Sequence, residues 1–317
     1  MSDGSHIEWT DATWNVATGC TKISDGCLNC YITRTPPFRM GHRRFDQSGI
    51  GGSTDVQLHE DRLTHPLRWS SPRKVFVCSL ADLFHEDVPD AYLARVFAVM
   101  ALAPQHTFQL LTKRHARMRS LLSSEAFMSA VDDAAYRMAR GDDPDVTGAA
   151  RREAYRAHAG WMVTWPGTGG RLLPWPLPNV WVGVSAETQT WADIRVPVLL
   201  DTPAAVRWVS VEPMLGPIGL HAVGGVDALC PDVDQYPGVR TDPHPGLDWV
   251  VCGCESGRLS ARPMDLAWAE QILADCRESG VPVLVKQLPT GPRGRATQDM
   301  TTFPERLRVR EYPAVTR

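Results

Sequence analysis

The sequence predicts an α/β fold, a partial (β/α) TIM-type barrel with a cysteine cluster loop after the first strand and two loop-rich insertions. Two observations predict it. Short, near-continuously apolar runs recur along the chain, as in parallel strands that are covered on both faces. Helical patterns lie between several of these runs, and strand–helix alternation is typical of a parallel sheet. We therefore expect residues 1–317 to form a single domain, with insertions at about 123–178 and 221–247.

Each element is predicted from its local sequence. The strand runs are rich in β-branched and aromatic residues, which favour extended backbone. The predicted strands are Thr13–Ala17, Val75–Cys78, Thr107–Leu111, Val180–Val184, Val206–Val211, Trp249–Cys252 and Val281–Val285. The clearest helices are Asp90–Leu102 and Met264–Ser279; a Val-Pro-Asp start signal opens the first and Gly280 follows the second. Both insertions are rich in Pro and Gly, and we expect loops or small subdomains there.

Composition limits the classes of function. The net charge is −3, so a nucleic-acid surface would have to be a local patch. The sequence contains no apolar run of about 18 residues and no secretory signal pattern, so we expect a cytoplasmic protein without a membrane partner. Eight cysteines in a cytoplasmic chain of 317 residues favour metal or redox chemistry over a disulfide framework.

Three cysteines share one short loop, "GCTKISDGCLNCY". Cys20, Cys27 and Cys30 have the spacing C-x6-C-x2-C. They suit a zinc site with a fourth ligand such as His42, a disulfide with a spare thiol, or a [4Fe–4S] cluster with one open iron. The loop follows the first predicted strand, at the catalytic end of a β/α series, and lacks the second C-x2-C unit of a zinc knuckle. Its position therefore favours the cluster.

Polar side chains follow six of the predicted strands. In a β/α barrel the carboxyl ends of the strands form the active face, so these residues are candidates for a site. The alternative is that strands simply end where polarity begins. The residues are Ser79 and Asp82; Thr112, Lys113 and Arg114; Ser185 and Glu187; Glu212; Glu255 and Ser256; Lys286 and Gln287.

The cysteine loop and the barrel pattern resemble a radical S-adenosylmethionine (SAM) enzyme, whose usual signature is C-x3-C-x2-C. Nine motifs in order along the chain, among them "IEWTDATWN", "VFVCSLADLF", "LLTKR", "VSVEPMLGP" and "CGCESG", are similar to an uncharacterised phage and bacterial family called phage gene product thirty-seven/sixty-eight. The resemblance implies that Cys20, Cys27 and Cys30 ligate a [4Fe–4S] cluster whose fourth iron binds SAM. It further implies a 5′-deoxyadenosyl radical that abstracts hydrogen from a substrate, and an electron donor such as flavodoxin or ferredoxin.

The same resemblance assigns roles to the strand-end residues. Those expected to contact SAM are Ser79, Asp82, Ser185, Glu187 and Ser256. Those expected to line the pocket as acid/base or hydrogen-bonding groups are Lys113, Glu212, Glu255, Lys286 and Gln287. Cys254 stands where the family is expected to have glycine. Cys252 and Cys254 would share one face of a strand, either as small buried hydrophobes or as a second thiol pair near the cluster.

Two basic segments suggest the substrate. "RTPPFRMGHRRF" interleaves arginines with Phe38 and Phe45, and "TKRHARMR" follows the third strand. Arginine near aromatics suits phosphate contact and base stacking, so we expect an anionic substrate such as a nucleotide or nucleic-acid base, with modification or repair as the outcome. The alternatives are a solvated face paired with some of the 36 acidic residues, a non-enzymatic zinc- or cluster-stabilised nucleic-acid-binding protein, and an enzyme of small-metabolite synthesis.

Overall fold

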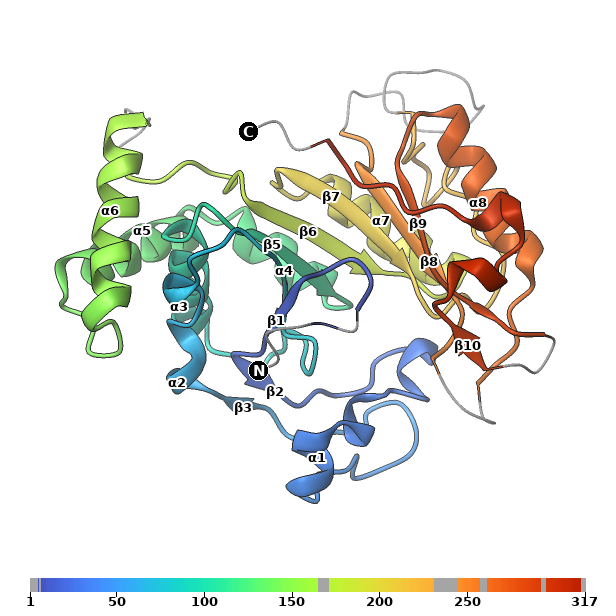
Figure 1. Cartoon of the computed structure of the whole chain (residues 1–317), viewed down its shortest axis with the longest axis horizontal. Helices are drawn as coiled ribbons and strands as arrows, with labels where there is room; N and C mark the ends of the chain where they lie inside the picture. The colour runs from blue at the N-terminus through green and yellow to red at the C-terminus, as the bar shows by residue number, and fades with distance from the viewer. Residues whose placement is uncertain are drawn as a thin grey trace. The chain divides into compact units, whose positions relative to one another are not determined.

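The computed structural model describes residues 5, 7–164, 171–230, 245–256, 261–291 and 295–314 (Figure 1). Contacts divide the chain into two compact units, and each is discontinuous in sequence. Unit 1 consists of Met1–Cys20, Asp55–Val182 and Thr202–Ala205; unit 2 consists of Thr21–Thr54, Gly183–Asp201 and Val206–Arg317. One boundary falls directly after the first cysteine of the cysteine loop.

The strands belong to an eight-stranded, mostly parallel sheet. In unit 1 the order is β1 (Ala12–Trp14), β4 (Lys74–Val77), β5 (Thr107–Thr112), and in unit 2 it is β7 (Val206–Val211), β8 (Trp249–Gly253), β9 (Val283–Pro289), β10 (Ala296–Thr297). The unit boundary divides β6 (Val180–Ser185). Within each unit, the neighbouring strands of this sheet are parallel, except that β10 is antiparallel to β9. A second, two-stranded sheet pairs β2 (Ala17–Thr18) with β3 (Gln57–Leu58).

Unit 1 contains most of its helices between and after its strands. Its helices are α2 (Glu60–Leu63), η3 (Pro66–Arg68), α3 (Asp90–Ala101), α4 (His115–Leu122), α5 (Glu125–Arg140) and α6 (Gly148–Thr164). Helix α3 packs against α5, and α5 against α6 (Figure 1). Under them, Trp9 packs on Phe76 with ring centroids 4.6 Å apart, and Trp14 on Phe108 at 5.7 Å. These fully buried rings anchor β1 in the core.

Unit 2 contains the rest of the cysteine loop. Its helices are η1 (Asp25–Cys27), η2 (Ile32–Arg34), α1 (Pro36–Met40), α7 (Gln189–Leu200), α8 (Leu266–Glu278), η4 (Met300–Thr302) and η5 (Glu305–Leu307). Helix α7 packs on β7, and α8 packs on β8 and β9. Helices α7 and α8 each begin at a side-chain cap. Thr188 accepts from Trp191 N, and Asp265 accepts from Ala267 N at 3.0 Å.

The α/β class, the strand positions and the mostly parallel order are confirmed, while the partial barrel and the single domain stay predictions. Three details of the sequence interpretation are corrected. The first strand run is split, because β1 ends at Trp14 and Ala17 pairs with Leu58 in the second sheet. The first insertion is largely helical, since α5 and α6 occupy much of it. Strand β9 runs on to Pro289, because Gln287 pairs with Gly253 of β8 and Leu288 and Pro289 pair with β10.

Part of the second insertion, residues 231–244, lies outside the described residues. Its preceding portion forms turns, with an isolated antiparallel bridge between Val223 and Val226. Throughout the described part of the chain, every helix is too short or too polar to span a bilayer.

Candidate functional site

The C-x2-C half of the cysteine loop is built from two successive tight turns. The Cys27 amide donates to Ser24 O at 2.9 Å, and the Cys30 amide donates to Cys27 O at 3.2 Å. Both thiols are half-buried, and neither belongs to a disulfide. Residues three apart in such turns lie on the same side of the backbone, so we expect the two sulfurs to face the same way. The two thiols are therefore candidate ligands for a metal or cluster.

A buried ion pair anchors the loop from strand β6. The Gly26 amide donates to Glu187 Oε1 at 3.1 Å, and Glu187 Oε2 lies 3.0 Å from Arg195 NH1. Both charged side chains are 0% exposed. A Cβ at position 26 would lie 3.0 Å from Glu187 Cδ, so glycine allows the backbone to approach this carboxylate. Glu187 thus fixes the turn that leads into Cys27.

A second carboxylate anchors the loop from strand β8. Glu255 Oε2 accepts from Asn29 Nδ2 at 2.8 Å and from the Arg262 amide at 2.9 Å. The Arg262 guanidinium also pairs with Glu255 and donates to Asp25 O at 2.9 Å. Burial opposes ionisation of Glu255, but the hydrogen bonds from Arg262 and Asn29 outweigh it and lower the pKa of the carboxyl. A charged carboxylate therefore holds the residue before Cys30.

These two anchors fix where the loop lies within unit 2. Glu187 comes two residues after the end of β6, and Glu255 comes two residues after the end of β8. The loop therefore sits against the carboxyl ends of parallel strands, the edge at which α/β sheets bind ligands. Sequence reasoning predicted this edge for Glu187 and Glu255 but assigned both to ligand contact. In the structure their oxygens contact the cysteine turn, and their contact with a ligand stays a prediction.

Other predicted residues of unit 2 form a small polar group around Glu212. Lys286 Nζ lies 3.1 Å from Glu212 Oε1, and Ser210 Oγ donates to Oε2 at 3.3 Å. Ser185 Oγ donates to the Glu212 carbonyl at 3.2 Å. Gln287 is almost fully buried and donates to Cys254 O at 2.6 Å. The sequence had suggested that Lys286 and Gln287 follow the strand. Both lie within β9.

Cys252 and Cys254 are both buried in β8 and the residues that follow it. Burial, reinforced by the nearby Glu212 carboxylate, raises the pKa of each thiol to about 12. These are the properties of small buried hydrophobes and not of reactive thiolates. Gly253 between them is closely packed, because a Cβ there would lie 3.0 Å from Glu212 Oε1 and 3.1 Å from Gln287 O.

The remaining predicted residues belong to unit 1. Buried Asp82 accepts from Thr112 Oγ1 at 2.7 Å and from the Lys113 amide at 3.0 Å. Ser79 Oγ donates to Asn15 Oδ1 at 3.2 Å. The residue before Cys20 joins this region, since the Gly19 amide donates to Leu80 O at 2.9 Å. Cys20 itself is half-buried and is not part of a disulfide.

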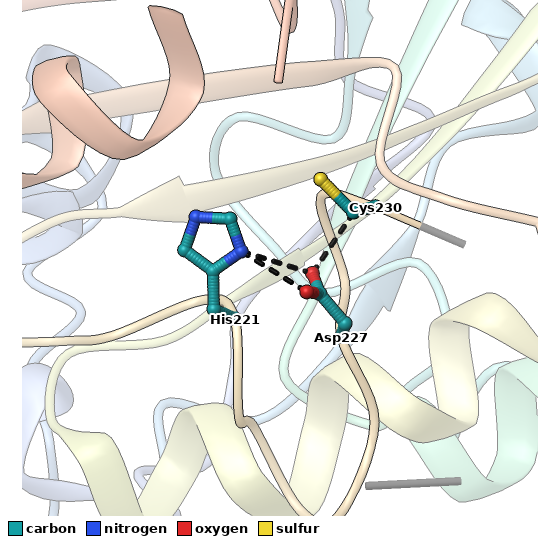
Figure 2. Close-up of side chains that lie close together, drawn as sticks. All are labelled: His221, Asp227 and Cys230. Atoms are coloured by element: carbon teal, nitrogen blue, oxygen red, sulfur yellow. Dashed lines mark hydrogen bonds and ion pairs between the residues drawn. The ribbon is translucent and has the colours of Figure 1, made fainter. Parts of the chain in front are cut away.

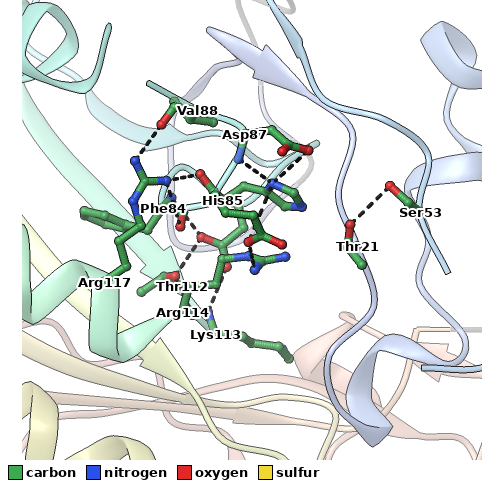
Figure 3. A network of polar contacts seen from close by, with 12 residues as sticks. Thr21, Ser53, Phe84, His85, Asp87, Val88, Thr112, Lys113, Arg114 and Arg117 are labelled. Carbon is green, nitrogen blue, oxygen red and sulfur yellow. Dashed lines mark hydrogen bonds and ion pairs between the residues drawn. The ribbon is translucent and has the colours of Figure 1, made fainter. Parts of the chain in front are cut away.

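The basic segment after β5 is held by acidic and carbonyl groups of unit 1 (Figure 3). Arg114 forms an ion pair with Glu86. Arg117 pairs with Asp90 and donates to Val88 O at 2.6 Å and to the carbonyl of His85. The salt-bridge alternative is therefore correct for these two arginines, and the contact with an anionic substrate predicted for them is not favoured.

Sequence reasoning missed the two arginines that orient the anchoring carboxylates. Arg195 lies in α7, and Arg262 lies shortly before α8. It also missed a cluster of His221, Asp227 and Cys230, whose ligand atoms lie within 4.8 Å of one another (Figure 2). The short spacing H-x5-D-x2-C was the available signal. Within this cluster, His221 Nδ1 lies 3.1 Å from Asp227 Oδ2, and Asp227 Oδ1 accepts from two backbone amides.

Comparison of the chain with curated proteins and with solved structures gave no significant match. A family model does match, over nearly the whole chain. The match covers residues 4–304 and therefore includes the cysteine loop, both anchoring carboxylates and all the strands of both units. The chain belongs to the family described as "Protein of unknown function (DUF5131)".

Proposed function

We propose that this protein is a radical SAM enzyme, in which Cys20, Cys27 and Cys30 ligate a [4Fe–4S] cluster at the mouth of a partial (β/α) barrel. The observation that carries the proposal is the anchored turn of unit 2. Two half-buried thiols lie on one short loop, and carboxylates that follow two parallel strands hold it in place. A structure-stabilising loop does not need attachment to the ligand-binding edge of a sheet.

The donor set fits this group. Thiolates are the ligands that iron–sulfur clusters take, and three of them leave one iron of a [4Fe–4S] cluster open to SAM. When bound, the cluster supplies the electron that cleaves SAM to methionine and a 5′-deoxyadenosyl radical, which abstracts hydrogen from the substrate. An external donor such as flavodoxin or ferredoxin would return that electron.

The protein's own residues would hold the cysteine turn in position and carry a proton near the substrate. Glu187 and Glu255 act as positioning residues, because their oxygens are engaged by the cysteine turn and by Arg195 and Arg262. Glu212 and Lys286, 3.1 Å apart and partly exposed, form the pair in unit 2 best suited to hold or move a proton. Exposed Ser256 remains the predicted contact for SAM on this side.

The test begins with protein purified and reconstituted without oxygen. We expect about four irons and four sulfides per chain and, after dithionite reduction, an EPR signal that changes on addition of SAM. Cys27→Ala and Cys30→Ala should abolish the signal. Cys230→Ala is the matched control, since Cys230 is also free and half-buried but lies outside the loop, and it should retain the cluster.

Stoichiometric zinc with no iron and no response to SAM would contradict the proposal. That result would favour the alternative, a non-enzymatic zinc- or cluster-stabilised nucleic-acid-binding protein. The observation that keeps this alternative is a pocket in unit 2 lined by basic side chains, described below.

A further inference from the structure

A large pocket lies in unit 2 next to the cysteine loop. Its volume is about 1170 Å³, and its wall includes Arg34 and Ser256. Arg34 donates to the carbonyl oxygens of Asn29 and Ser256, at 3.3 and 3.1 Å. The Arg34 guanidinium therefore lines the pocket and also contacts the loop that carries Cys30. Most of the residues that line the pocket belong to one segment, 33–48.

The pocket is strongly cationic. Its basic lining residues are Lys22, Arg34, Arg39, His42, Arg43 and Arg44. Among the lining residues, Asp46 is the one carboxylate, so five Lys and Arg against one Asp leave a net charge of +4 with His42 neutral. Asp46 also accepts a hydrogen bond from the Ser53 amide at 2.7 Å. The pocket thus concentrates positive charge in a chain whose net charge is −3, and such a site attracts anions.

Two of these cations contact aromatic rings and carbonyl oxygens. Lys22 is 5% exposed; its Nζ lies 4.3 Å from the centre of the Phe45 ring and donates to Ser48 O at 2.8 Å. Arg43 lies 4.5 Å from the Phe38 ring centre and donates to Thr54 O. A nearly buried ammonium without a counter-ion is costly, and an anion in the pocket would relieve that cost.

The other basic side chains are exposed. Arg39, His42 and Arg44 line the pocket, and within the described residues their side chains make no ion pair or side-chain hydrogen bond. Two guanidiniums of this kind beside a half-exposed phenylalanine ring supply phosphate contacts and a stacking surface. The volume exceeds what a single small ligand needs, since typical ligand pockets span roughly 300–1,000 Å³.

We propose that this pocket binds the sugar–phosphate backbone of a single-stranded nucleic acid, with Arg39 and Arg44 on phosphates and Phe45 stacking on a base. The inference names the substrate class of the proposed reaction and rests on that proposal for its catalytic meaning. The binding itself is independent of the cluster. DNA and RNA share the recognised groups, and the experiment separates them.

Fluorescence anisotropy tests the inference with a labelled 12-nucleotide DNA strand, the same sequence as RNA, and the DNA duplex, each titrated with the full-length protein at several salt concentrations. We expect the Arg39→Gln/Arg44→Gln variant to raise Kd for single strands about tenfold, because two of the phosphate contacts are lost. The slope of log Kd against log salt should fall by about 1.4, or 0.7 for each contact removed.

Arg137→Gln/Arg152→Gln is the matched control. Both arginines are exposed on α5 and α6 of unit 1, outside the pocket. Their removal should leave Kd within about twofold of the wild-type value and the salt slope within about 0.3 of it. Equal losses in the two double variants, unchanged binding in the pocket variant, or no wild-type binding at 50 mM salt would each overturn the inference. Tighter binding of the duplex would overturn the single-strand assignment.

The same titration on Cys27→Ala separates this inference from the proposed function. Retained binding in a variant without cluster supports the pocket even if the radical chemistry is wrong. A SAM-responsive cluster in a protein that does not bind either strand would leave the proposed function in place and contradict only the pocket assignment.

Discussion

The two basic segments of this chain look alike in sequence but differ in what surrounds them. Each has four Lys or Arg residues within eleven or fewer positions: Arg34–Arg44 in unit 2 and Lys113–Arg119 in unit 1. In the second, Arg114 and Arg117 face Glu86 and Asp90. In the first, the arginines contact rings and carbonyl oxygens or line an open pocket.

The difference separates two uses of positive charge. A cation with a carboxylate partner contributes to stability, and its removal leaves the partner unpaired. A cation without one contributes little to stability and is available to a ligand. Substitutions should therefore divide into those that lower the free energy of unfolding and those that lower affinity. The four predictions below run from the largest expected loss of stability to the smallest.

Glu187→Gln should have the largest effect. It removes the counter-ion of Arg195, which is fully buried and also contacts Ser185 O at 2.6 Å and the Trp191 ring at 4.1 Å. Breaking a buried pair in this way costs about 3–5 kcal/mol. Urea unfolding of the variant measures the loss.

Glu125→Gln is the control for this prediction. Glu125 pairs with Arg171 at 3.0 Å but is 77% exposed, and the cost there should be below about 1 kcal/mol. If the two variants unfold at the same urea concentration, the buried pair is not what holds the cysteine turn.

Arg117→Gln should lower the free energy of unfolding by less than Glu187→Gln does, but by more than a surface substitution does. Its guanidinium donates to Val88 O and the His85 carbonyl and pairs with Asp90, so it ties α4 to the segment after β4. Hydrogen bonds to charged groups are worth about 1.5–3 kcal/mol, and we expect a loss in that range by urea unfolding. Affinity for single strands should not change. Weaker binding without loss of stability would instead assign this segment to the ligand.

Some of this arrangement was predictable from sequence. Apolar runs located the strands of both units because buried parallel strands need them on both faces. The polar residues at strand ends singled out Glu187 and Glu255 as site residues, and the structure places both in contact with the cysteine loop. Sequence did not reveal how their oxygens are used, because the partners, Arg195 and Arg262, follow them in elements whose packing sets the geometry.

Other features depend on contacts between residues far apart in sequence. The partners of Arg114 and Arg117 come from residues 86 and 90, about 30 positions earlier. No local pattern distinguishes these arginines from Arg39 and Arg44. The helices α5 and α6 were missed for another reason: their charged, alanine-rich sequence next to Pro- and Gly-rich stretches resembled a loop insertion, although Ser124 caps α5 by accepting from Phe127 N at 3.3 Å.

Glu255 should make stability depend on acid. The pKa of its carboxyl is lowered in the folded protein, against an ordinary value of 4.5. Its contribution is therefore fully present above pH 4.5 and is lost as the pH falls through the folded pKa. We expect Glu255→Gln to be less stable than the wild type at pH 7, with a difference that shrinks between pH 5 and pH 3. Urea unfolding at each pH measures it, and a constant difference would contradict the assignment.

Arg39→Gln should have the smallest effect on stability and is the most informative about the pocket. Arg39 is exposed on α1 and lines a cavity with a net charge of +4. Removal of one unpaired charge from such a group relieves repulsion as much as it loses contacts, so the free energy of unfolding should stay within about 0.5 kcal/mol of the wild type. Affinity for single strands should nevertheless fall, and adding salt should weaken the variant's binding less steeply. A variant that loses stability and keeps affinity would place Arg39 with Arg117, among the cations that hold the fold, and the distinction between the two basic segments would no longer stand.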